Sequence, residues 1–295
     1  MAGLVLSVGG LTASVVKYAG DALLAFIELV EEDADSENES DEESEEEGKE
    51  ESEELRFKRI QKLDAEKAKP VAILGTHILD LLEEYKGDSR VTVPVIKTID
   101  FLCVNMCFAG LSRAYQSEWS GRCMTLLRGE LRGSTDITKL LGAVDVAISI
   151  LSLPAAYDAV KFVLTSLCHS FPKVRKITAE KLYAALLGID LQDLLDVVLV
   201  GEEKRLIADP TLSQSEPLPF PLDSDLDARM KEISNLLTRT SWDSKIAVCR
   251  PYRNKLYPLL GLIPPVSATR KLVTKKPIAK DSDMSYKNLV REMGY

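Results

Sequence analysis

A few residues have the type and spacing that metal binding would require. His77 and Asp80 stand three residues apart on an expected helix, where they could supply half of a metal site. No second such pair follows in the sequence, so a pair on a helix surface is the better interpretation. Cys103 and Cys107 stand four residues apart in an apolar helical pattern, which favours core packing over zinc. We therefore expect neither a metal nor a cofactor.

The sequence also lacks a complete set of residues for nucleophilic catalysis or for phosphate binding. Cys168 and His169 are adjacent, and adjacent residues on a helix do not face each other. At this helix end we instead expect Cys168 to fill the core and His169 to be a cation favoured by the helix dipole. The stretch "SVGG" at 7–10 lacks the Gly-Lys-Ser/Thr that a phosphate-binding loop needs, so it fits a tight turn between two helices. The sequence predicts a protein that is not an enzyme.

Cysteine usage and hydropathy indicate the compartment. The five cysteines lie within apolar helical patterns and not at the spacings of a disulfide framework, which predicts buried thiols in a reducing cytosol. A membrane span would need a run of about 20 apolar residues, and the sequence contains none of that length. We expect a cytoplasmic protein with no membrane span.

Charge is distributed unevenly along the chain. The net charge is −9, yet residues 31–54 hold sixteen acidic residues and one lysine, which leaves +6 for the rest. We expect this stretch to form a disordered, solvated loop, because it repels itself and has almost nothing to bury. It could also repel nucleic acid, bind a basic partner, or accept phosphate at Ser36, Ser40 and Ser44. We expect no binding to nucleic acid.

Most of the remaining chain has the apolar periodicity of α-helices. Residues 137–151 carry apolar side chains at helical spacing behind a Ser/Thr/Asp cap, and no alternating strand pattern occurs. Four prolines in 208–224 predict a loop there. The predicted fold is all-α, with helices at 12–30, 56–86, 92–109, 115–131, 137–151, 155–169, 173–187, 190–202, 225–240 and 244–261.

Two of these expected helices resemble each other. "FPKVRKITAEKL" aligns with "VPVIKTIDFLCV" so that Pro172 matches Pro94 and, at the same shift, Arg175 matches Lys97. Pro172 suits a first helical position, because its missing N–H is not needed there and its φ is already helical. The shift corresponds to two units of about 40 residues, which indicates a helical repeat.

Weaker correspondences place further copies near both ends. Val16 and Lys17 resemble Ile96 and Lys97 of the second copy, and Lys255 and Leu256 repeat Lys181 and Leu182. The Val-Arg pair at 174–175 also resembles the second helix of a HEAT repeat. We therefore expect stacked helix pairs of the HEAT or armadillo type over residues 1–262, interrupted by the loops at 31–54 and 208–224.

The cations of this repeat and of the chain end are candidate partner contacts. Arg175 and Lys176 fall in the first turn of a helix packed on two sides, so we expect mainly a structural role, with their charge carried to the loop edge or to a neighbouring repeat. Residues 263–295 read as a basic, flexible tail. The candidate partner-binding residues are Arg175, Lys176, Arg270, Lys271, Lys275 and Lys276.

Four stretches together resemble one known family. They are "GLVLSVGGLTASVVKYAGDALLAF", "RVTVPVIKTIDFL", "LCHSFPKVRKITAEKLYAALL" and "SWDSKIAVCRPYRNKLYPLLG". In this order and at these separations they resemble the C-terminal region of tubulin-folding cofactor D, over roughly residues 3–262. Family members are much longer, and they lack the acidic insertion. The resemblance implies that this chain is a C-terminal fragment or a short form.

The resemblance also implies a function and partners. These are a HEAT-repeat chaperone that captures β-tubulin, works with cofactors E and C in assembling the α/β-tubulin heterodimer, and binds an Arf-like small GTPase. It implies a role in microtubule biogenesis and cytoskeleton organisation, in the cytoplasm and at microtubules or centrosomes. The alternative is a helical-repeat scaffold or nuclear-transport-type adaptor that binds basic cargo through the acidic loop.

Overall fold

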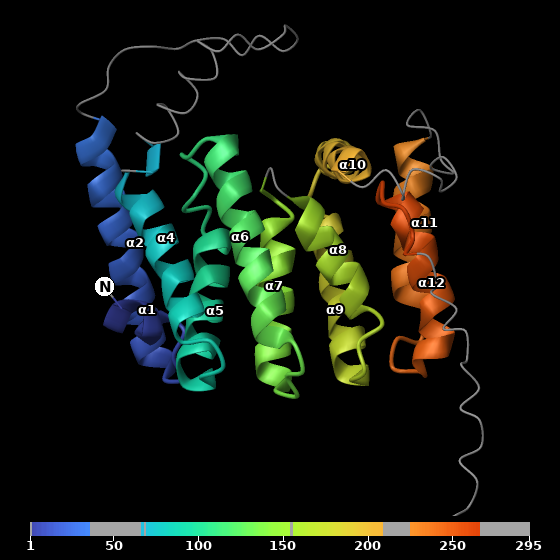
Figure 1. Cartoon of the computed structure of the whole chain (residues 1–295), viewed down its shortest axis with the longest axis horizontal. Coiled ribbons are helices and arrows are strands. Elements are labelled where there is room, and N and C mark those ends of the chain that lie inside the picture. The colour runs from blue at the N-terminus through green and yellow to red at the C-terminus, as the bar shows by residue number, and fades with distance from the viewer. Residues whose placement is uncertain (1, 36–65, 68, 154–155, 209–224, 266–295) are drawn as a thin grey trace, which may run out of the picture. The chain divides into compact units, whose positions relative to one another are not determined.

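The computed structural model describes residues 2–35, 66–67, 69–153, 156–208 and 225–265. Residues 1–263 form one compact unit, which contains every labelled helix, and residues 264–295 form a second, of which only the first two residues are described. Within the described residues the chain is helical and has no strand (Figure 1). The all-α prediction is therefore confirmed.

Most helix bounds lie within a few residues of the expected ranges. The exceptions are α4, which begins at Pro70 after the extended Lys69 where a helix over 56–86 was expected, α10, which continues to Ala208 and not only to residue 202, and α1, which was not among the expected helices. The helices are α1 (Ala2–Val8), α2 (Ala13–Asp35), α4 (Pro70–Glu84), α5 (Ser89–Val104), α6 (Arg113–Leu131), α7 (Ile137–Ile150), α8 (Ala156–Ser166), α9 (Pro172–Leu186), α10 (Leu191–Ala208), α11 (Leu226–Arg239) and α12 (Ile246–Leu259).

The helices of the first unit pack in two layers, except α10, which lies across the others and packs on α8 (Figure 1). One layer runs from α1 through α5, α7 and α9 to α11, and the other from α2 through α4, α6 and α8 to α12. Each pair that is consecutive in the chain, such as α4 with α5 or α8 with α9, packs one member in each layer. Stacked helix pairs in which each contacts its neighbours are the arrangement of an α-solenoid, as the repeat predicted.

The repeat register is partly correct. Helices α5 and α9 lie in the same layer with α7 between them, so the shift that aligns Pro172 with Pro94 joins equivalent helices. Val174 and Ile96, which the same shift aligns, are both buried. The two weaker correspondences instead pair α2 with α5 and α12 with α9, which lie in opposite layers. Those matches do not relate equivalent positions.

Local signals explain where helices begin. Pro172 is the first residue of α9 and Phe171 before it is extended, as expected. Pro94, its aligned counterpart, lies inside α5, which begins earlier because the Asp88 carboxylate accepts the N–H of Arg90 at 2.9 Å. The N-cap signal at Asp88 therefore outranks the proline in setting this boundary.

A tight turn joins the first two helices, where "SVGG" stands. Gly9 is buried there, and a Cβ on it would lie 1.8 Å from the carbonyl oxygen of Pro94. The turn therefore rests directly on the backbone of α5, and only glycine permits that approach. This contact fixes the first helix pair against the second.

The core is continuous through the unit. Trp119 Nε1 donates to the carbonyl oxygen of Gly75 at 3.0 Å, and the Tyr115 hydroxyl donates to that of Ala72 at 2.8 Å, so α6 is held on α4 by hydrogen bonds as well as apolar contact. None of the five cysteines forms a disulfide bond; four are buried as predicted, and Cys168 is half-buried.

The acidic stretch begins as helix. We expected a loop from residue 31, yet α2 continues to Asp35. Glutamate is a good helix former, so a helix already propagating through Val30 continues into the first acids. Residues 36–54, most of the Pro-rich segment and the basic tail from 266 lie outside the described residues, so their predicted disorder stays a prediction.

A membrane-spanning helix was not expected. Among the described helices, none combines the length and the apolar character that a membrane span requires.

Candidate protein-interaction site

Arg175 lies at a joint between two helix pairs. Its side chain is 2% exposed although it carries a charge. The guanidinium donates hydrogen bonds to the backbone carbonyl oxygens of His169, Ser170, Trp242, Asp243 and Ser244. The distance to the Trp242 oxygen is 2.8 Å and that to the His169 oxygen 2.6 Å. Arg175 thus ties the start of α9 to the turn between α11 and α12.

This geometry agrees with the structural role expected for Arg175, at the loop edge. A planar fork of five N–H donors suits a cluster of carbonyl oxygens that converge from two separate turns. Its neighbour Lys176 is exposed. The other four candidate contacts, Arg270, Lys271, Lys275 and Lys276, lie outside the described residues. Partner binding by any of these six residues stays a prediction.

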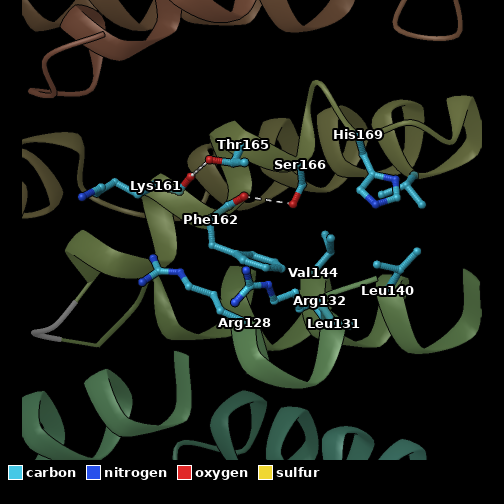
Figure 2. A pocket seen from close by; sticks show the side chains of 11 residues that line it. Arg128, Leu131, Arg132, Leu140, Val144, Lys161, Phe162, Thr165, Ser166 and His169 are labelled. Atoms are coloured by element: carbon cyan, nitrogen blue, oxygen red, sulfur yellow. Dashed lines mark hydrogen bonds between the residues drawn. The ribbon is translucent and has the colours of Figure 1, made fainter. Parts of the chain in front are cut away.

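A pocket of about 430 Å³ opens beside this joint (Figure 2). It lies between the pair α6–α7 and the pair α8–α9, and we call it the inter-pair pocket. The lining residues are Arg128, Leu131, Arg132, Leu140, Val144, Lys161, Phe162, Thr165, Ser166, His169 and Val174. His169 connects the pocket with the Arg175 joint, because its side chain lines the one and its carbonyl oxygen accepts in the other.

The inter-pair pocket is polarised. Figure 2 shows Arg128 and Lys161 toward one end, with Leu140 and His169 at the other and Phe162 between them. The spacing of lining residues along α6 and α8 follows helix geometry, since positions four apart lie on one face. The pocket therefore offers cations at one end and apolar surface at the other.

Two of its cations have internal partners. Arg128 pairs with the Asp158 carboxylate at 2.9 Å. Lys161 Nζ donates to the Tyr157 hydroxyl at 3.1 Å and lies 4.7 Å from the centre of that ring. Partial burial, followed by the nearby Arg205 charge, lowers the pKa of Lys161. An anion placed here would offset both effects.

A polar network supports Lys161 from behind. The Tyr157 hydroxyl donates to the Glu202 carboxylate at 2.6 Å, and Glu202 also accepts from Arg205 at 2.7 Å. Burial, followed by the Glu202 charge, raises the pKa of Tyr157. Gly201 lies against the same tyrosine, since a Cβ there would come within 2.4 Å of its ring. This network attaches α10 to α8.

His169 differs from its expected role. We expected a cation favoured by the end of α8, but burial, with a contribution from Arg175, lowers its pKa. The N–H of Phe171 donates to Nδ1 of His169 at 3.2 Å, which requires an unprotonated ring nitrogen. The histidine is neutral because a charge would be poorly solvated beside the Arg175 guanidinium.

The candidate metal ligands and nucleophiles lie in surroundings that indicate a structural role. Asp80 pairs with Arg122 at 2.7 Å and His77 is exposed on the same helix. Among the residues that the structure describes, no group of three or more His, Cys, Asp or Glu side chains could hold a metal ion. Burial raises the pKa of Cys123 to about 12 and that of Cys103 well above its usual value, so both thiols stay protonated.

One buried ion pair was not foreseen from the sequence. Lys139 at the start of α7 pairs with Glu130 at the end of α6, and both side chains are almost fully buried. Glu130 also accepts from the Thr92 hydroxyl at 3.2 Å and from the N–H of Gly87 at 2.8 Å. The positions of Glu130 and Lys139 on either side of a turn are a weak sequence signal for an ion pair. Their burial depends on packing against α5 and could not be predicted from the sequence.

The inter-pair pocket was also not foreseen, because its walls come from four helices. Lys161 stands far from Arg128 and Arg132 in the sequence, and only the packing of two pairs brings it to the same pocket. An Arg at i and i+4 near the end of an expected helix, as at 128 and 132, was the available signal.

Comparison with known proteins indicates one family. Residues 1–46 and 45–139 match the family model described as the C-terminal region of tubulin folding cofactor D, slightly less than half of the chain. The match covers α1 to α6 and reaches the beginning of α7. No solved structure matches the chain.

Proposed function

We propose that this protein, whose residues 1–139 match the C-terminal region of the tubulin folding cofactor D family, is a chaperone-type scaffold in tubulin folding. The family match is the observation that carries the proposal. It supports the resemblance that the sequence suggested and is consistent with a chain made of stacked helix pairs. In this proposal the protein works by binding and not by catalysis.

The finer proposal concerns partners. We propose that the chain contributes to the capture of β-tubulin and to assembly of the α/β heterodimer, together with cofactors E and C and an Arf-like small GTPase. Stacked pairs present an extended surface, which suits a large folded partner better than a small substrate. The cytoplasm, with association at microtubules or centrosomes, is the corresponding location.

Charge supports contact with an acidic partner. Outside residues 31–54 the chain carries a net charge of +6, which favours encounter with a negatively charged surface. We propose Lys176, together with the tail cations Arg270, Lys271, Lys275 and Lys276, as direct contacts. Arg175 acts from within, because it holds the start of α9 and so positions the exposed Lys176.

The test is retention of purified tubulin heterodimer by the immobilised full chain, at low and at physiological salt. We expect retention that weakens as salt rises. Reversing the four tail cations to glutamate, or Lys176→Glu, should reduce it several-fold. Lys173→Glu is the matched control, because Lys173 is also exposed on the first turn of α9.

Two results would count against the proposal. If the full chain retained no tubulin at low salt, tubulin binding by this chain would be wrong. If it instead retained a basic peptide, and lost that activity when residues 36–54 were removed, the adaptor alternative would take its place.

A further inference from the structure

We infer that the inter-pair pocket is a binding site for an acidic peptide segment, which inserts one bulky apolar side chain and places its flanking carboxylates against the cations at the pocket mouth. The inference goes beyond the proposed role in tubulin folding. It concerns the chemistry of the segment, whichever protein carries it, and it stands even if tubulin is not a partner.

The apolar end of the pocket suits a side chain. Val144 and Leu140 of α7 and Val174 of α9 line the pocket, and all three side chains are buried. The volume of about 430 Å³ falls within the range of roughly 300–1,000 Å³ usual for ligand pockets. An aliphatic or aromatic group there would contact these buried side chains and would remove exposed surface of the half-buried Phe162 from water.

The cationic end selects for negative charge. The lining of the pocket contains Arg128, Arg132 and Lys161 but no carboxylate. The nearest acids are already engaged, Asp158 with Arg128 and Glu202 with Tyr157 and Arg205. Among the described residues, no carboxylate forms an ion pair with Arg132.

Lys161 provides a second reason to expect an anion. Its ammonium is half-buried, its hydrogen-bond partner is a neutral hydroxyl, and its pKa is lowered mainly by burial. An incoming carboxylate would restore the electrostatic stabilisation that burial removes. Arg132, which is exposed and lines the same pocket, would give a second carboxylate of the segment a bidentate partner.

The arrangement favours a peptide over a small anion. Arg128 lies in the last turn of α6 and Arg132 directly follows its end, so an extended peptide at this end of the helix can meet the two cations with different side chains. A small anion would satisfy the cationic end alone and would leave the apolar end filled with water. A segment with carboxylates on both sides of a large apolar residue meets both ends at once.

The experiment uses fluorescence anisotropy with the full chain and a fluorescein-labelled peptide, Glu-Glu-Leu-Phe-Glu-Glu. One comparison peptide replaces Leu-Phe with Ser-Ser, and another replaces all glutamates with glutamine. We expect saturable binding of the first peptide and at least tenfold weaker binding of both others, since each lacks one half of the recognition.

Two substitutions test the location. Arg132→Glu should weaken binding at least tenfold by repulsion, with Arg113→Glu, another exposed arginine of α6, as its control. Thr165→Trp should abolish binding by filling the pocket. Thr238→Trp is its control, because both threonines are exposed on helices and donate to the carbonyl oxygen four residues before them.

The outcomes decide the proposal whatever the tubulin assay gives. Loss in both pocket variants, with retained helical circular dichroism and unchanged binding in both controls, would support it. Equal binding of the Ser-Ser peptide would reduce the site to unspecific charge attraction, and displacement of the peptide by equimolar phenylacetate would make it a small-molecule site. Either result, unchanged binding by a folded Arg132→Glu variant, or no binding at all would overturn the proposal.

Discussion

At the scale of single residues, Arg175 is the group whose loss should cost most. Removing a buried guanidinium that donates to five carbonyl oxygens takes the hydrogen bonds of all five at once, and only the Trp242 and Ser244 oxygens keep a weak donor, the Cys249 thiol. We expect Arg175→Met, which retains most of the apolar stem, to lower the free energy of unfolding by about 3 kcal/mol. Chemical denaturation followed by circular dichroism measures this change.

The neighbouring residue is the control for that change. Lys176→Met removes a charge of the same sign from the exposed side of the same turn, and should change the free energy of unfolding by less than about 0.5 kcal/mol. An equal loss in both variants would contradict the assignment of Arg175 as the joint.

His169 should make stability depend on pH. Its pKa in the folded protein lies below the ordinary 6.5, so the folded state binds fewer protons than the unfolded state. The stabilisation is therefore present above pH 6.5 and is lost as the pH falls through and below that value. His169→Asn keeps an acceptor for the Phe171 N–H and should flatten this part of the profile. Thermal unfolding at a series of pH values measures it.

The sequence predicted these residue roles unequally. It indicated that Arg175 is structural and reaches a loop edge, because a long cation in the first turn of a doubly packed helix has few other options. It could not identify the loop, which lies far along the chain at Trp242. For His169 the sequence favoured a charged ring, since neither the burial nor the nearby guanidinium is visible in it.

At the scale of elements, the turn between α1 and α2 depends on glycine. Gly9→Ala would place a methyl group 1.8 Å from the Pro94 carbonyl oxygen, which the backbone of α5 cannot avoid without shifting. We expect a loss of about 2–3 kcal/mol and altered packing of the first pair on the second. Thermal unfolding and hydrogen exchange in α1 would detect both.

A glycine inside a helix gives the opposite expectation. A Cβ on Gly121 of α6 would meet no atom within 4 Å, so Gly121→Ala should stabilise the protein by about 0.5–1 kcal/mol through helix propensity. A destabilised Gly121→Ala together with a neutral Gly9→Ala would show that propensity, and not contact with α5, controls these positions.

Element positions were predictable where the local signals were strong. The amphipathic stripe and cap of α7 and the proline of α9 gave boundaries within a few residues. For α5 the expected range of 92–109 began and ended too late, because the cap at Asp88 was not recognised and the helix ends at Val104. The short α1 lacks both a visible cap and a full period of apolar residues, so its existence was only implied by the turn that follows it.

At the scale of the whole unit, the stack should unfold in parts. Its principal contacts join helices that are near one another in the layers, so stability is approximately a sum of local terms. We expect Arg175→Met to increase hydrogen exchange in α11 and α12 strongly while α4 to α7 keep their protection. Equal loss of protection throughout would show instead that the unit unfolds as a single cooperative body.

The layered arrangement was predictable from the sequence, whereas the inter-pair pocket was not. A constant shift between two similar helices indicates stacking, and the structure places α5 and α9 accordingly. The size of the pocket depends on the separation between the pairs α6–α7 and α8–α9. That separation depends in turn on side-chain volumes at many contacts. Leu140, Val144 and Val174 look like ordinary core residues in the sequence.

The joint at Arg175 also has a mechanical meaning. A force that separates the α8–α9 pair from the α11–α12 pair would act on a few directional hydrogen bonds from one guanidinium. These bonds cross the seam, the boundary between α9 and the turn before α12. Apolar seams elsewhere in the stack can slide and re-form over a range of extensions, whereas such a fork yields abruptly once its geometry is lost. The seam would therefore stay closed up to a threshold force and then open abruptly. Below that force the two pairs could not separate while they hold a partner.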